Sequence, residues 1–77
     1  MEQIKDVGKV GVNSFKEVVG RRFAVYYRLA YHQDPKIGCF EGVCENFSIR
    51  NCAFSDEKYG FNVIDYSLIV SLIDITK

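Results

Sequence analysis

The stretch RFAVYYRLAYH, residues 22–32, alternates between two kinds of side chain. One parity holds only large apolar or aromatic residues: Phe23, Val25, Tyr27, Leu29 and Tyr31. The other parity holds the charged and polar residues of the stretch together with smaller ones: Arg22, Ala24, Tyr26, Arg28, Ala30 and His32. Successive side chains of a strand point to opposite faces of a sheet, so this alternation predicts a half-buried β-strand over residues 22–33.

The only proline of the chain follows, in Gln33-Asp34-Pro35-Lys36, and predicts a tight reversal. Residues 37–50 would then return as the second strand of a hairpin. Its register stays open. A two-residue turn places Arg28 opposite Glu41, which pairs opposite charges, and a three-residue loop places Leu29 opposite Cys39, which aligns apolar residues. The odd-numbered residues of this segment are mostly apolar, and the alternation passes Gly42 without a shift, so an unbroken strand is expected. The apolar residues that share this face are Ile37, Cys39, Val43, Phe47 and Ile49.

Residues 51–60, NCAFSDEKYG, carry turn-forming residues at both ends and predict a polar loop. Residues 61–76 are rich in Ile and Val and predict a third strand. Its expected core face holds Ile64, Tyr66, Leu68, Val70 and Leu72, so Val70→Asp should unfold the domain. The other face of residues 63–75 is mixed and not polar, which suggests a central strand or a surface that a partner covers.

Before the first strand, Ser14-Phe15-Lys16-Glu17 has the form of a helix-capping box, and Gly20 is well placed to end a short helix. The helix begins either at Ser14 or near Glu2, and an extended strand over residues 9–12 is the competing interpretation. The apolar residues of the helix would be Ile4, Val7, Phe15, Val18 and Val19. They would cover the sheet residues Val25, Leu29, Val43, Leu68, Val70 and Leu72.

Together these elements predict an α+β fold: a single domain over residues 1–77, with an N-terminal helix packed on an antiparallel sheet of three to four strands. A chain of 77 residues with 48% apolar residues can build one core without crosslinks.

The formal net charge is zero, which argues against general attraction to nucleic acid or to an anionic membrane. Residues 1–36 carry seven basic and four acidic side chains, and residues 37–77 carry three basic and six acidic ones. Arg21, Arg22 and Arg28 would form a small basic patch. No apolar run at the N-terminus has the form of a signal peptide, so a cytoplasmic protein without membrane contact is expected.

All three cysteines lie within GCFEGVCENFSIRNC, residues 38–52. On a regular strand Cys39 and Cys44 face opposite sides, so they cannot share a metal ion or a disulfide. The gaps of four and seven residues between the cysteines differ from common zinc-ligand spacings. Free cysteines that fill space as small apolar side chains are the expectation. A small zinc-binding domain that uses the cysteines with His32 stays as an alternative.

Catalysis is not expected, because His32 is the only histidine and no nucleophile lies beside a base at local spacing. Glu41 and Glu45 resemble a carboxylate pair, but solvated charges that discourage pairing at a strand edge are the commoner explanation. The leading expectation is therefore a non-catalytic protein-binding module without a cofactor, in the style of small phage or virus proteins that inhibit a host enzyme or defence complex. Its expected contact residues are Arg21, Arg22, Tyr26, Arg28, Phe40, Glu41 and Glu45.

A weak single-stranded nucleic-acid-binding protein is the second alternative. Tyr26 and Phe40 would stack on bases while Arg22 and Arg28 hold phosphates. Homodimerisation through the mixed face of residues 63–75 is compatible with either kind of binding.

Overall fold

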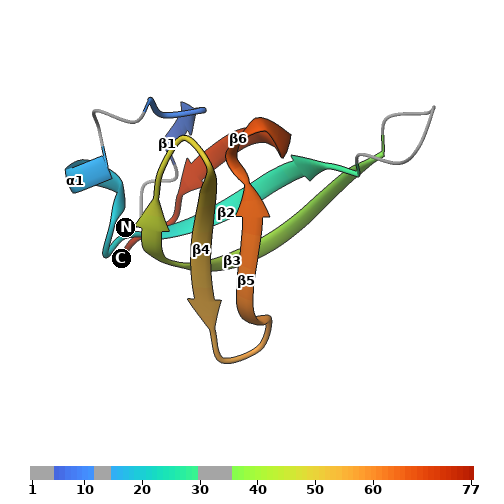
Figure 1. Cartoon of the computed structure of the whole chain (residues 1–77). Coiled ribbons are helices and arrows are strands. Elements are labelled where there is room, and N and C mark those ends of the chain that lie inside the picture. Colours follow the sequence, from blue (N-terminus) through green and yellow to red (C-terminus); the bar gives the residue numbers. More distant parts are fainter. Residues whose placement is uncertain (1–4, 12–14, 30–35) are drawn as a thin grey trace.

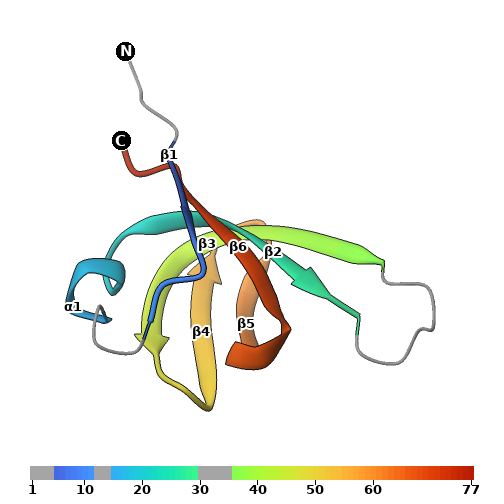
Figure 2. The same cartoon turned by 90° about the horizontal axis from the view of Figure 1, so that it is seen from above.

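The computed structural model describes residues 5–11, 15–29 and 36–77. Over these ranges the chain forms one antiparallel sheet of six strands in the order β1-β6-β2-β3-β4-β5 (Figures 1 and 2). The elements are β1 (Lys5–Gly8), α1 (Phe15–Val18), β2 (Arg22–Arg28), β3 (Ile37–Phe47), β4 (Asn51–Asp56), β5 (Gly60–Asp65), the 3-10 turn η2 (Tyr66–Leu68) and β6 (Ile69–Asp74).

The predicted α+β fold is wrong, because no helix of the described residues covers the sheet. α1 is a single turn of four residues. The segment before it forms the edge strand β1 and not a helix, with Asp6 paired to Ile73 of β6. Gly8 and Gly11 disfavour a helix there, and the competing strand over residues 9–12 is also misplaced. The predicted end of α1 is confirmed: Gly20 follows with a φ of +88°, which suits glycine. Ser14 of the capping box lies outside the described residues.

The β2–β3 hairpin is confirmed, but its register is neither of the two expected ones. Val25 pairs with Phe40, and the ladder continues to Arg28 opposite Ile37. The Leu29 amide then donates a hydrogen bond of 3.1 Å to the Lys36 carbonyl. The pairing of the hairpin therefore extends at least to Leu29 and Lys36, and the predicted turn at Asp34-Pro35 lies outside the described residues.

β3 contains a bulge, which the sequence did not predict. Cys44 pairs with Phe54 and Asn46 pairs with Ala53, so Glu45 has no partner of its own on β4. The extra residue reverses the side to which later side chains point. As a result, the buried residues of β3 are Phe40, Gly42 and Cys44 before the bulge and Phe47 after it. The predicted apolar parity is wrong for Ile37, Cys39 and Ile49, all of which are exposed.

The predicted loop over residues 51–60 is wrong, since it contains β4 with three successive buried residues, Cys52, Ala53 and Phe54. The predicted single strand over residues 61–76 is also wrong. Its first part is β5 at one edge of the sheet; η2 follows, and the chain then continues as β6, which lies between β1 and β2.

The sheet is strongly bent within β3. Residues 37–43 pair with β2 and residues 43–47 pair with β4, so that Val43 alone has both neighbours. In Figure 1, β2 and β3 run across the view while β4 and β5 run upright. Gly42 permits the bend, because a Cβ there would lie 3.0 Å from the Ser55 carbonyl oxygen. The bend folds the two halves of the sheet over one core, formed by Val18, Phe23, Val25, Phe40, Cys44, Phe47, Cys52, Phe54, Ile69 and Leu72.

Candidate functional site

The seven residues predicted to contact a partner do not form one surface. Arg22, Tyr26 and Glu41 lie on the outer face of the β2–β3 hairpin, since Glu41 pairs with Ala24 and Cys39 pairs with Tyr26. Phe40 points the other way and is only 8% exposed, so it belongs to the core. The others are separated along the molecule: Arg21 precedes β2, Arg28 ends β2, and Glu45 in the bulge of β3 accepts a hydrogen bond from Ser55.

Arg22 is engaged within the protein. Its guanidinium donates hydrogen bonds to Asp56 of β4 and, at 3.4 Å, to Glu41 of β3. The hydrogen bond with Asp56 is the main reason why the pKa of Arg22 is raised. The Tyr59 amide and then Arg22 hold the pKa of Asp56 below its usual value. Arg22 therefore connects the two halves of the bent sheet, and its charge is already compensated.

The proposed nucleic-acid platform is consequently reduced to one aromatic residue. Phe40 is buried, Arg22 is paired, and Tyr26 remains partly exposed beside Cys39. Electrostatic repulsion from Cys39 is the main cause of the raised pKa of the Tyr26 phenol. Stacking on one ring is worth about 1–3 kcal/mol per base, which gives little affinity without more cations nearby.

The cysteines are also divided between the two faces. Cys39 is exposed, whereas Cys44 and Cys52 are buried in the core. Burial raises the pKa of Cys44 to about 12 and also raises that of Cys52. Both thiols stay protonated and donate hydrogen bonds to backbone carbonyls, Cys44 to Asn46 at 3.5 Å and Cys52 to Ser48 at 3.8 Å. The described residues contain no group of three or more potential metal ligands, and His32 lies outside them.

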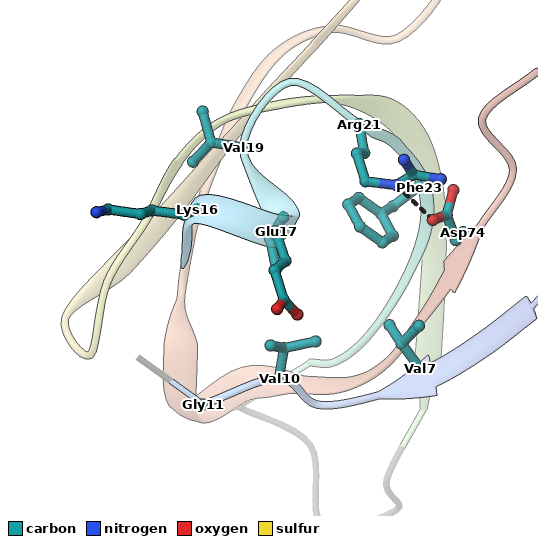
Figure 3. A pocket seen from close by; sticks show the side chains of 10 residues that line it. Val7, Val10, Gly11, Lys16, Glu17, Val19, Arg21, Phe23 and Asp74 are labelled. Atoms are coloured by element: carbon teal, nitrogen blue, oxygen red, sulfur yellow. Dashed lines mark hydrogen bonds and ion pairs between the residues drawn. The ribbon is translucent and has the colours of Figure 1, made fainter. Parts of the chain in front are cut away.

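A cavity of about 790 Å³ lies between β1 and α1 (Figure 3). Phe23 and Val18 form its buried base, with Val7 and Val10 on the β1 side. At its rim the Arg21 guanidinium donates a 2.6 Å hydrogen bond to Asp74. Burial alone would raise the pKa of Asp74, but hydrogen bonds from Arg21 and Thr76 outweigh it and lower the pKa.

The chemistry of this cavity is limited. The paired Asp74 is ionised and weakly basic, and the described lining holds no serine, cysteine or histidine to act as a nucleophile. Lys16 and Glu17 are exposed on α1. We find no catalytic arrangement in the described lining.

The other edge of the sheet presents apolar side chains to solvent. Among the described strands, β5 pairs with β4 alone. Phe61 and Val63 are two positions apart on β5, so their side chains lie on the same face, and they are 66% and 59% exposed. The sequence pointed to part of this surface, because Val63 belongs to the mixed face of residues 63–75. Phe61 was missed, because the predicted strand over residues 61–76 begins with it but the mixed face was counted only from residue 63.

A groove of about 530 Å³ runs beside β5, between β5 with η2 and the far end of the β2–β3 hairpin. Its apolar lining comes from both sides: Tyr27, Leu29 and Phe40 from the hairpin side, and Val63, Ile64 and Leu68 from the β5 side. Arg28 and Asp65 line it as well and bring opposite charges. We call the unpaired edge of β5, with Phe61 and Val63, the β5 edge, and we call the neighbouring groove the β5 groove. Together they form the most distinctive surface among the described residues.

Comparison of the chain with protein-family models, with curated proteins and with solved structures found no match. Within the described ranges, no helix has the length and apolar character needed to cross a membrane.

Proposed function

We propose that this protein is a non-catalytic protein-binding module, and that it binds an extended segment of its partner as an additional strand on the β5 edge. The observation that carries the proposal is the pair of exposed apolar side chains, Phe61 and Val63, on an outermost strand. An unpaired edge offers backbone amides and carbonyls to a second chain, and alternate side chains give the contact its specificity.

Edge strands are normally protected against such pairing. Proteins blunt them with lysine, proline, inward charges or a covering segment. β5, GFNVID, has neither lysine nor proline, and its single charge is Asp65 at its end. Burying Phe61 and Val63 under a partner would contribute about 1–3 kcal/mol for each side chain. The strand thus has the properties of an interaction surface more than those of a protected edge.

The finer expectation, that the partner is a host enzyme or a defence complex which the module inhibits, belongs to the same proposal. The identity of the captured protein decides it. The predicted contact residues on the outer face of β2 and β3 are not needed for strand addition.

The test compares capture of partner proteins from nuclease-treated cell lysate by the tagged wild-type protein and by a double variant, Phe61→Lys with Val63→Lys. We expect the double variant to lose at least about 90% of the captured partner, because lysine on an edge opposes strand addition. Melting temperatures of both proteins should agree within a few degrees, as both positions are exposed.

Ile49→Lys is the matched control. Ile49 is 68% exposed and lies between β3 and β4, so Ile49→Lys places a lysine at an exposed apolar position away from β5. Capture should be unchanged by it. Equal capture by the wild type and the double variant would contradict the proposal, and so would loss of every partner on nuclease treatment.

A further inference from the structure

We infer that the β5 groove receives one large apolar side chain of the added strand, and that Arg28 pairs with a carboxylate two residues away from it. The partner segment would therefore combine an aromatic or long aliphatic residue with Asp or Glu at the second position before or after it. This inference rests on the proposed function and specifies the chemistry of its partner.

The apolar half of the inference comes from the aromatic residues of the groove. The ring centroids of Tyr27 and Phe40 lie 5.7 Å apart, and Phe40 in turn lies 5.6 Å from Phe54 in an edge-to-face contact. These contacts fix Phe40 within the core while Tyr27 stays partly exposed. Leu68 of η2 contributes a further apolar contact. The groove is thus preformed, and an inserted apolar side chain meets ordered rings.

Gly38 determines where the Tyr27 ring lies. The two residues are paired across β2 and β3, and a Cβ at position 38 would lie only 2.3 Å from Cζ of Tyr27. The ring therefore occupies the space that a side chain at position 38 would fill. Gly38→Ala must displace the ring and change the groove without altering any residue of β5.

The charged half of the inference comes from Arg28 and Asp65, which line the groove on opposite sides. Arg28 is exposed at the end of β2, and Lys36 lies next to its pairing partner Ile37. Within the part of the chain that the structure describes, Arg28 has no ion-pair partner. Asp65 lies on the opposite side, at the end of β5. A carboxylate is therefore attracted to the hairpin side and repelled from Asp65, which orients the segment.

The side chains of residues i and i+2 of a strand share a face. An apolar residue that enters the groove and a carboxylate that reaches Arg28 can therefore lie two positions apart. We place the carboxylate before or after the apolar residue according to whether the added strand runs parallel or antiparallel to β5.

The probe is a set of capped synthetic peptides, Thr-Val-Thr-Phe-Thr-Glu-Thr and its reversed sequence, each also made with Ala in place of Phe and with Lys in place of Glu. Dissociation constants are measured by chemical-shift titration of ¹⁵N-labelled protein. For the tighter orientation we expect the Phe-to-Ala change to weaken binding at least about tenfold, and the Glu-to-Lys change to weaken it about three- to tenfold, as for an exposed ion pair.

Two protein variants make the test specific. Arg28→Glu should reverse the preference, so that the lysine peptide binds more tightly, whereas Arg50→Glu, an exposed arginine between β3 and β4, should not. Gly38→Ala should remove most of the preference for Phe over Ala while the melting curve shows a folded protein. Equal binding of all peptides, an unchanged preference in Arg28→Glu, or no binding of any peptide would overturn the inference. Strand addition itself is judged separately, by the capture experiment with Phe61→Lys and Val63→Lys.

Discussion

At the scale of single residues, the three cysteines show how the position in the sheet sets chemical behaviour. Cys44 and Cys52 are buried, donate hydrogen bonds to backbone carbonyls and have raised pKa values. Cys39 is exposed on the outer face, beside Tyr26. The expectation that cysteines fill space as small apolar side chains is confirmed for the two buried ones. Cys39 differs, because the inward positions before the bulge of β3 have the opposite parity.

We expect one thiol of the native protein to react with an aromatic disulfide reagent within minutes at pH 8, and all three to react after unfolding in guanidinium chloride. Thiolate is the reactive form, and burial opposes its formation in the core. Release of the coloured thiol at 412 nm measures the reaction. Cys39→Ser should abolish the fast phase. Fast reaction of three thiols in the native protein would contradict the burial of Cys44 and Cys52.

At the scale of elements, the sequence predicted strands well where pairing is regular. β2 has alternating residues, and Phe23 and Val25 are buried as predicted. β3 and β6 each contain a bulge, at Glu45 and at Val70, where Tyr26 pairs with Ser71 but Tyr27 pairs with Ile69. One extra residue changes the parity without changing the composition, so the sequence carries no local sign of it.

The break between β5 and β6 was not predicted from the sequence, for a related reason. η2 contains Tyr66-Ser67-Leu68, with no glycine or proline, and its residues continue the alternation of the strands on either side. The two strands are distinguished by their different places in the bent sheet, and no glycine or proline in the sequence marks the break between them. The candidate site was therefore only partly predictable. Val63 stood out as an apolar residue on a mixed face, whereas the groove is lined by residues of β2, β3, β5 and η2 that only the tertiary fold brings around one space.

The bulge in β6 leads to a prediction that reverses the sequence-based one for Val70. Val70 is 42% exposed, whereas Leu72 is fully buried. We expect Val70→Asp to change the melting temperature by only a few degrees. Leu72→Asp should prevent folding, because an unpaired carboxylate in the core costs several kcal/mol, comparable to the whole stability of such a domain. Circular dichroism melts of the two variants measure this, and equal destabilisation by both would contradict the register of β6.

At the scale of the whole molecule, polar contacts connect segments that are far apart in the sequence. Asp6 of β1 accepts a hydrogen bond from Ser71, Arg21 pairs with Asp74 of β6, and Arg22 pairs with Asp56 of β4. The pKa of Asp6 is lowered, chiefly by the hydrogen bond from Ser71. Asp56 and Asp74 also have lowered pKa values, so three carboxylates favour the folded state only when they are ionised.

The stability of the protein should therefore fall on acidification. A carboxylate with a lowered folded pKa binds fewer protons in the folded than in the unfolded state, where its pKa is about 3.9. Its contribution is complete above roughly pH 5 and is lost as the pH falls through the lowered folded pKa. We expect the melting temperature to drop across this range in thermal scans. Asp74→Asn should make the drop shallower, and a melting temperature that stays level or rises below pH 4 would contradict the assignment.

The place of β6 in the strand order also governs when the chain can fold during synthesis. β1 has β6 as its sheet neighbour, and β6 in turn separates β1 from β2. β1, which leaves the ribosome before the other five strands, therefore waits for its partner until residues 69–74 have also emerged. Such non-local pairing slows folding compared with hairpins of adjacent strands. The β2–β3–β4–β5 meander can form progressively as it appears, but closure of the sheet around β6 is a late step of biosynthesis.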